Sequence, residues 1–504
     1  MAKDFETRAD ERTIFFFSGQ IKPLILTSTE FSIMTLKLTY FLSVVTAVAE
    51  AFCFAGITFG WSSISTVFRS EGYFSAQCTQ QHNNQTNSNI TSSHSSCPEQ
   101  EQDMILVVTL AGFVLKASTV PLGVILDRLG TLATRCIGTV LLTVGTLLVS
   151  AALPSTSDLL YPAMCCNAVG GIFLLYTLMP LGNLFPSHRS LIITLINGAM
   201  DSSAAIFLFV KVAWDFGFTV HTLFNFIAAC TAFIWFRTLF LMPVKHVPFD
   251  TPHGFQLGVF GYFTKLVKAK NSEYSPLLSE DKDSDIGNVE ITKYSVVSFG
   301  TCLRTPEFWL NMFHIAILGL RMDMFISQAG PWLKTQSDTD REFESFINTF
   351  GTMQLLGIFC APLNGILVDR LIKAYSRKNT VKIATRKAIS VSLMTSTSLG
   401  VIFSALTCFE NPECVYIAFV FSVLFRAFLY GGNASFITLT YPGEHFGKLM
   451  GLTMVIGGVV SLLQYPLGSL ILTTLNGNFQ TFNIYTVFAC LITAVHPIAL
   501  RMRT

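Results

Sequence analysis

The stretch Gly123-Val-Ile-Leu-Asp-Arg-Leu-Gly-Thr-Leu-Ala-Thr-Arg135 decides how the rest of the chain is interpreted. It leaves an apolar run, places an acidic residue beside a basic one and turns at a glycine. A second copy, Gly365-Ile-Leu-Val-Asp-Arg370, also follows an apolar run and precedes basic residues. The two copies are separated by nearly half of the 504-residue chain. Self-similarity at such a distance predicts a structural repeat.

The composition predicts a membrane protein. The chain is 51% hydrophobic and 13% charged, whereas soluble domains carry about 25% charged residues. A net charge of +2 argues against a nucleic-acid partner. The sequence has no phosphate-binding glycine loop, nucleophile elbow or metal-ligand cluster, so we expect neither an enzyme nor a cofactor.

Twelve apolar runs are long enough to cross a bilayer, which takes about 20 residues each. They occupy residues 38–60, 104–126, 134–153, 159–183, 190–213, 221–242, 306–330, 346–368, 388–409, 415–440, 449–473 and 482–500. The expected fold is therefore an all-α membrane protein with twelve transmembrane helices in two six-helix repeats.

The same pattern divides the chain into four parts. We expect a cytoplasmic extension at 1–36, a six-helix bundle at 37–242, a polar cytoplasmic linker at 243–305 and a second six-helix bundle at 306–504.

The orientation follows from the basic residues, because Lys and Arg collect in cytoplasmic loops. With the N-terminus inside, Arg128 and Arg135 lie in an inner loop, and the loop after the eighth run carries seven Lys and Arg between residues 370 and 387. The outer loops hold Arg69, Lys334 and Arg341. Both termini are therefore expected in the cytoplasm.

The first outer loop, residues 62–102, supports this orientation. It contains the glycosylation acceptors Asn84-Gln-Thr and Asn89-Ile-Thr. It also contains Cys78 and Cys97, which we expect to form a disulfide in an oxidising compartment.

Twelve runs with Gly-x-x-x-Asp-Arg after the second run of each half resemble the major facilitator superfamily, over about residues 38–500. The resemblance implies alternating access, with the loop charges pairing with the neighbouring bundle to close an inner gate. Glycine allows close helix approach, and an acidic residue at a helix C-terminus needs a partner. The gate residues are Gly123, Asp127, Arg128, Gly365, Asp369 and Arg370.

Longer stretches resemble solute carrier family 43. They are Glu50–Trp61, Phe185–Ser203, Arg426–Ser435 and Tyr441–Lys448. Members of this family are facilitative transporters of purine nucleobases or of large neutral amino acids, and the match is closest to the nucleobase branch. The resemblance implies sodium-independent movement of adenine, guanine and hypoxanthine across the plasma membrane.

Ionisable groups inside a span are expensive and therefore functional candidates. Glu50 and Arg426 lie near mid-span in helices expected to line the cavity, which favours a pair between the two bundles, with separate structural hydrogen bonds as the alternative. A nucleobase needs aromatic faces and polar edges. The candidate substrate-binding residues are Glu50, Phe54, Asn197, Asp201, Ser202, Arg321, Gln354, Arg426, Tyr430 and Asn433.

Three alternatives remain open at this stage. The same inventory fits an amino-acid facilitator, because an arginine and Glu50 would bind a zwitterion. Glu50 or Asp201 could carry a proton, which would make the protein a symporter. A receptor or scaffold without flux is disfavoured by the paired gate motifs.

The linker contains Glu273-Tyr-Ser-Pro-Leu277-Leu278, which resembles an acidic dileucine sorting signal read by clathrin adaptors. An idle linker is the alternative interpretation.

Overall fold

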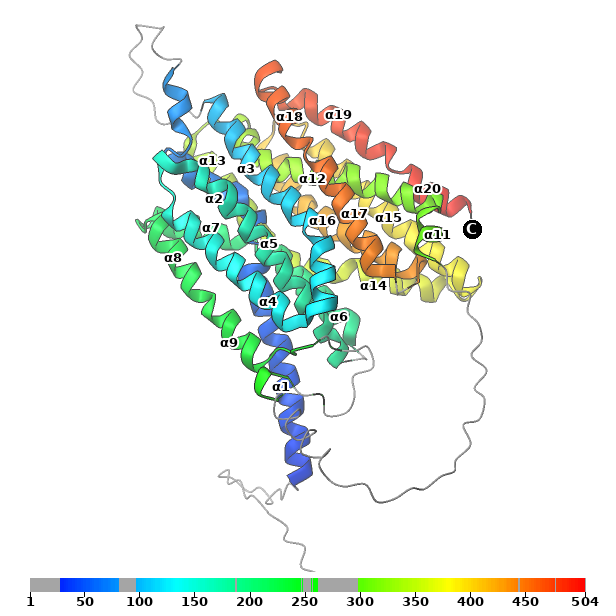
Figure 1. Ribbon diagram of the computed structural model, residues 1–504. Helices are drawn as coiled ribbons and strands as arrows, with labels where there is room; N and C mark the ends of the chain where they lie inside the picture. The colour runs from blue at the N-terminus through cyan, green and yellow to red at the C-terminus, as the bar shows by residue number, and fades with distance from the viewer. Residues whose placement is uncertain are drawn as a thin grey trace, which may run out of the picture.

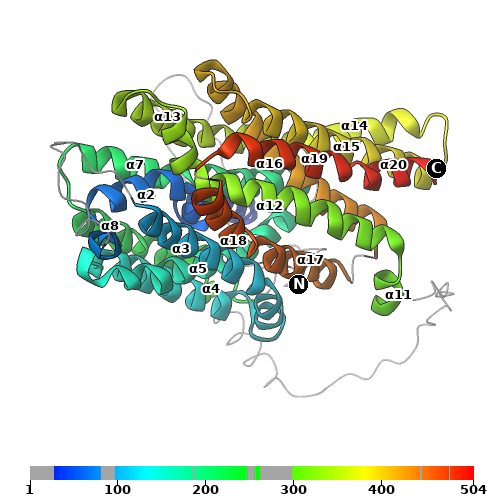
Figure 2. The same ribbon diagram turned by 90° about the horizontal axis from the view of Figure 1, so that it is seen from above.

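The structure is a computed structural model of the chain. It describes residues 28–80, 97–185, 188–245, 247, 255, 257–261, 298–442, 445–475 and 477–503. Figures 1 and 2 show the helices of the N-terminal half, coloured blue to green, beside those of the C-terminal half, coloured yellow-green to red.

The N-terminal half is built from helices that are interrupted at defined places. Its α-helices are α1 (Ser28–Glu50), α2 (Trp61–Ser70), α3 (Pro98–Ala117), α4 (Thr119–Ala151), α5 (Leu160–Leu178), α6 (Arg189–Ser202), α7 (Ala205–Asp215), α8 (Val220–Cys230) and α9 (Ala232–Phe240). A π-helical turn, Ala51–Ala55, and a 3-10 turn, Ile57–Gly60, join α1 to α2.

The C-terminal half follows the same plan. Its α-helices are α11 (Phe299–Leu303), α12 (Pro306–Thr335), α13 (Asp340–Met353), α14 (Gly357–Tyr375), α15 (Val381–Leu406), α16 (Pro412–Thr440), α17 (Phe446–Ser461), α18 (Gln464–Ser469), α19 (Phe479–Ile492) and α20 (Val495–Met502). A 3-10 turn, Gln354–Leu356, joins α13 to α14.

Eleven helical segments of the described chain are long and apolar enough to cross a membrane, against twelve expected runs. The second expected run is the exception, because the structure divides it between α3 and the start of α4. The division has a local cause, since Pro121 has no N–H to donate to the carbonyl of Ala117, the last residue of α3. The apolar remainder of that run continues in α4, past Gly130, into the third run.

Gly130 forms the turn in the opening stretch. Its φ of 81° lies in the left-handed region that favours glycine. The chain reverses there, so α4 contains the end of one expected span and nearly all of the next. In the second copy of the motif, α14 ends at Tyr375 and α15 begins at Val381.

Backbone contact joins the first and fifth spans at mid-membrane. A Cβ atom at Gly56 would lie 2.4 Å from the carbonyl oxygen of Met200, and one at Gly60 would lie 2.1 Å from that of Ala204. The N–H of Gly56, freed by the interruption of its helix, donates to Ser203 Oγ at 3.2 Å. Two glycines four residues apart therefore let these broken helices pack backbone to backbone.

A buried ion cluster holds the N-terminal half together. Glu50 Oε2 accepts from Arg135 Nη2 at 2.7 Å and from Arg237 Nη1 at 2.5 Å, and all three side chains are fully buried. The cluster joins the end of α1 to α4 and α9. Arg135, which the sequence analysis placed in a cytoplasmic loop, is therefore a core residue, because the turn at Gly130 returns the chain to the bundle before that residue.

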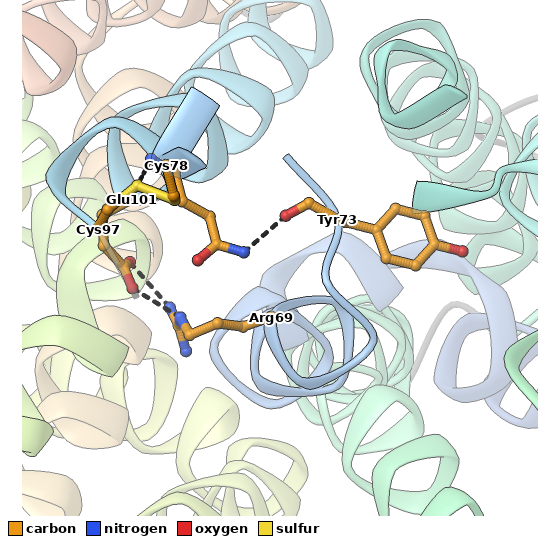
Figure 3. The surroundings of a disulfide bond; sticks show 6 residues. Arg69, Tyr73, Cys78, Cys97 and Glu101 are labelled. Carbon is orange, nitrogen blue, oxygen red and sulfur yellow. Dashed lines mark hydrogen bonds and ion pairs between the residues drawn. A yellow bond between two sulfur atoms is a disulfide. The ribbon is translucent and has the colours of Figure 1, made fainter. Parts of the chain in front are cut away.

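The predicted disulfide is present on the opposite side of the membrane from Gly130. Cys78 and Cys97 are bonded, and next to them Arg69 at the end of α2 forms an ion pair with Glu101 in the first turn of α3 at 2.6 Å (Figure 3). Gln100 Nε2 donates to the carbonyl of Tyr73 at 2.7 Å. These contacts tie the end of α2 to the start of α3.

Glu50→Gln is expected to destabilise the protein more than Arg237→Gln does. The first variant leaves two buried guanidinium groups without their carboxylate, and breaking a buried pair in that way costs about 3–5 kcal/mol. The second leaves a balanced Glu50–Arg135 pair. The melting temperatures of the two purified variants measure the difference. Equal melting temperatures would show that Glu50 does not balance the two arginines.

Candidate functional site

An ion pair between the two halves lies at mid-membrane. Arg426, in the middle of α16, places Nε 3.1 Å from Asp201 Oδ1 near the end of α6. Arg426 Nη2 also donates to the carbonyl of Asp201. The side chains of Arg426 and Asp201 are 3% and 17% exposed, so this charge pair is almost dry.

A second ion pair crosses the same interface. Lys116 near the end of α3 pairs with Asp323 of α12. Lys116 Nζ also donates to Ser461 Oγ of α17 at 2.7 Å, and that hydroxyl donates to Asp323. One basic residue from the N-terminal half is thus held by two elements of the C-terminal half.

Aromatic side chains lie beside these charges. The guanidinium of Arg426 stands 5.3 Å from the ring centroid of the half-buried Phe59. Tyr430 lies one turn further along α16 than Arg426. Tyr430 also lines a small cavity with Lys116. The two ion pairs and the two rings therefore form one polar cluster between the halves.

The backbones of the two halves approach closely at this cluster. A Cβ atom at Gly198 would lie 2.8 Å from the Cα atom of Ile358, and one at Gly357 would lie 2.9 Å from Asp201 Cβ. Ser202 Oγ donates to the carbonyl of Leu355 at 3.1 Å and accepts from the N–H of Ile358 at 2.8 Å. Ser202 thus satisfies backbone groups at the 3-10 break between α13 and α14.

The predicted Glu50–Arg426 pair is wrong. Glu50 is bonded within the N-terminal half to Arg135 and Arg237, and the carboxylate partner of Arg426 is Asp201. The sequence shows which residues are ionisable, but the rotation of each helix about its axis decides which of them face the interface. Phe54 is also buried in the core of the N-terminal half.

Three other predicted residues lie inside the C-terminal half or at its edge. Arg321 donates to Ser404 and Thr407 of α15 and its neighbouring turn, away from the polar cluster. Asn433 accepts from Asn311 Nδ2 at 2.7 Å. Gln354 is buried at the break before α14, and its Oε1 has no hydrogen-bond partner among the described residues.

Asn197 lies one turn before Asp201 on α6 and is half-buried. Its Nδ2 donates to the carbonyl of Ile193 in its own helix at 2.9 Å.

The structure adds residues that the sequence analysis did not place in the site. Lys116 and Asp323 were recognisable as ionisable groups within spans, but they are 207 positions apart and nothing in the sequence pairs them. Nothing in the sequence marks Ser461 or Phe59 as a site residue, because serine and phenylalanine are common in apolar helices.

The two Gly-x-x-x-Asp-Arg gate motifs lie away from the polar cluster, near the turns that follow the second and eighth expected spans. Asp127, Arg128, Asp369 and Arg370 are exposed, and within the described part of the chain none of the four has an ion-pair partner. A Cβ atom at Gly123 or at Gly365 would meet nothing within 4 Å. The close helix approach and the partner for Asp127 that the sequence analysis expected are therefore not formed among the described residues.

The glycosylation acceptors Asn84 and Asn89 and the sorting signal Glu273, Leu277 and Leu278 lie outside the described residues.

Comparison with known proteins shows which family the chain resembles in sequence. Residues 51–463 match the family model described as Major Facilitator Superfamily. The chain is 35% identical over 464 residues to equilibrative nucleobase transporter 1 of Bos taurus, covering 90% of this chain and 94% of the relative. It is 26% identical to large neutral amino acids transporter small subunit 3 of Homo sapiens, covering 84% of this chain and 86% of the relative.

Among solved structures, the crystal structure of a nucleoside transporter, NupG, superposes with a TM-score of 0.53. The match covers 92% of this chain and 99% of that chain at 14% sequence identity, so it establishes the fold alone.

The ion pair between Lys116 and Asp323 can be tested by exchanging its charges. Lys116→Asp and Asp323→Lys each place two like charges in a nearly dry interface, and we expect each to lower the melting temperature of the purified protein. The double exchange restores opposite charges and is expected to recover most of the loss. Arg503→Gln is the matched control, because it removes an exposed surface pair, which contributes about 0–1 kcal/mol. Additive losses in the double variant would contradict the pairing.

Proposed function

The chain belongs to the major facilitator superfamily, and from that membership we propose that it is an equilibrative carrier of purine nucleobases. Its family and relatives are membrane transporters and not enzymes. Specifically, we propose that it moves adenine, guanine and hypoxanthine across the plasma membrane without sodium. The 35% identical nucleobase transporter supports this choice of substrate.

The observation that carries the proposal is the polar cluster between the halves. Its two acidic and two basic side chains form two complete ion pairs, Asp201–Arg426 and Lys116–Asp323. A site whose charges balance internally suits a solute that is neutral at pH 7. Purine nucleobases meet this condition.

The cluster also offers the contacts that a purine needs. The carboxylates of Asp201 and Asp323 accept from N–H groups of the base, and Arg426 and Lys116 donate to its ring nitrogens and carbonyl oxygens. Phe59 and Tyr430 provide aromatic faces for the flat ring. A bound base would replace the hydrogen bonds that the ion-paired side chains make to one another, so their donors and acceptors stay satisfied as the halves separate.

The contacts between the halves fit an alternating-access cycle. On the side of the disulfide, the Arg69 guanidinium packs against Gly330 of α12 and Leu208 packs against Gly351 of α13. On the other side the gate residues are exposed and unpaired within the described chain. We propose that this state is closed to the outside, and that Asp127 and Asp369 find their partners when the inner gate closes.

We also propose the membrane arrangement that this cycle requires. The bundles at 37–242 and 306–504 rock about the cluster, and the linker at 243–305 and both termini face the cytoplasm. The positive-inside distribution of Lys and Arg supports this orientation.

A second candidate substrate is a large neutral amino acid. The 26% identical amino-acid transporter favours it, and the carboxylate and ammonium of a zwitterion would fit Arg426 and Asp201. Proton coupling is a further alternative, in which Asp201 would carry the proton.

Uptake of labelled adenine and of labelled leucine, in cells expressing the chain, separates these possibilities. We expect saturable adenine uptake that is unchanged when sodium is replaced by choline and when external pH is varied between two values. Leucine uptake without adenine uptake would contradict the nucleobase proposal. Loss of uptake on raising the external pH would establish proton coupling.

Variants of the cluster test the site itself. Asp201→Asn and Arg426→Gln are each expected to reduce adenine uptake by at least about tenfold, because a lost charged hydrogen bond is worth about 1.5–3 kcal/mol. Arg503→Gln is again the control and should transport normally at equal surface expression. Normal adenine uptake by both cluster variants would place the site elsewhere.

A further inference from the structure

Arg321 differs from the other buried basic side chains. Six lysine and arginine residues are buried in the described part of the chain. Five of them pair with a carboxylate: Lys116, Arg135, Lys211, Arg237 and Arg426. Arg321 is 5% exposed and has no Asp or Glu within ion-pair distance among the described residues.

The groups around the Arg321 guanidinium are neutral. Nε donates to Ser404 Oγ and Nη2 donates to Thr407 Oγ1, both at 2.9 Å. The ring of Phe403 lies 4.6 Å from the guanidinium carbon. Hydroxyl groups and an aromatic face lessen the cost of burying this charge, but they supply no opposite charge, and an isolated buried ion is expensive.

A small cavity adjoins this guanidinium. Its volume is about 20 Å³, which is enough for one particle of the size of a water molecule. Arg321, Phe325, Gln328 and Trp332 line it from one face of α12, since residues three and four apart on a helix are neighbours. The other walls are Met324, Thr407, Phe479, Phe482 and Asn483.

Two further hydrogen-bond donors at this cavity are unsatisfied. Gln328 Nε2 and Trp332 Nε1 are buried and have no partner within the described residues. Buried polar groups are nearly always paired, so each unpaired donor needs an explanation. An indole N–H and a guanidinium donate and never accept.

We propose that this cavity binds a chloride ion or another monovalent anion of halide size. The ion would supply the missing negative charge at Arg321 and accept hydrogen bonds from the donors that line the cavity. The small volume favours a single-atom anion over a carboxylate or a phosphate, which need room for several heavy atoms. This site is separate from the Asp201–Arg426 cluster and does not depend on the substrate of the carrier.

The buried ion cluster of the N-terminal half offers a useful contrast. All three nitrogens of Arg135 and all three of Arg237 donate hydrogen bonds to protein oxygens. Every nitrogen of those two arginines thus has a protein partner, whereas Nη1 of Arg321 makes no hydrogen bond to a described residue.

The position of the cavity connects it with the packing of the two halves. Gln328 lies against Gly468 of α18, and Gly468 in turn lies close to Ile105 of α3 in the N-terminal half. Occupancy by an anion is therefore expected to stabilise the halves in the arrangement seen here.

The experiment measures the melting temperature of the purified full-length protein while sodium chloride replaces sodium gluconate at constant ionic strength. A ligand that binds the folded state raises the melting temperature in a saturable way. We expect a rise of about 3 °C that saturates with chloride concentration and is reproduced by bromide. The same melting temperature in chloride and in gluconate would overturn the proposal and leave a cavity that holds water.

Two variants assign the effect to this cavity. Trp332→Phe keeps the ring but removes the N–H donor, and we expect the half-saturating chloride concentration to rise about tenfold. Arg321→Met removes the charge and is expected to abolish the chloride response. Arg503→Gln should respond as the natural chain does. An unchanged response in Trp332→Phe would place the anion elsewhere, and this variant decides the question if Arg321→Met does not fold.

Discussion

Two ion pairs that cross the interface between the halves, Asp201–Arg426 and Lys116–Asp323, are the interaction on which the rest of the structure depends. In the interior of a membrane protein a charge is tolerated where it has a partner. Here each partner comes from the opposite half. In the alternating-access cycle proposed here, the halves separate when a solute offers donors and acceptors to those side chains.

The two repeats share their topology but are stabilised differently at equivalent places. In the N-terminal half, α1, α4 and α9 meet at the ion cluster of Glu50, Arg135 and Arg237. In the C-terminal half, the equivalent helices α12, α15 and α20 meet at His314. Its Nε2 lies 3.1 Å from Ser396 Oγ, and its ring centroid lies 5.7 Å from that of His496. The two halves thus share their helix order and the meeting point, whereas the residues there are charged in one half and histidines in the other.

Much of the fold could be predicted from the sequence, because a run of apolar residues and a repeated Gly-x-x-x-Asp-Arg motif are properties of local sequence. The run at 104–126 shows the limit. It contains a helix break before Pro121, and the structure distributes it over α3 and α4. Likewise Arg135, which composition alone does not distinguish from Arg128, returns to the core because Gly130 adopts a positive φ.

The site was harder to predict than the fold. The sequence analysis named Asp201, Ser202, Arg426 and Tyr430 as candidate substrate-binding residues. The structure brings them together at the interface, and their role in binding stays a prediction. Glu50 and Arg321 are likewise ionisable residues within predicted spans, yet each is bonded inside its own half. Helix rotation makes that difference, and single-sequence patterns contain little information about rotation in helices that are apolar on every side.

The most direct test of this account is a structure of the protein with adenine bound. The account predicts density for the base between Phe59 and Tyr430, with its edge within hydrogen-bond distance of Asp201 or Arg426, and one or both ion pairs between the halves rearranged. Adenine bound against Glu50 or in the cavity beside Arg321, with both ion pairs intact, would contradict it.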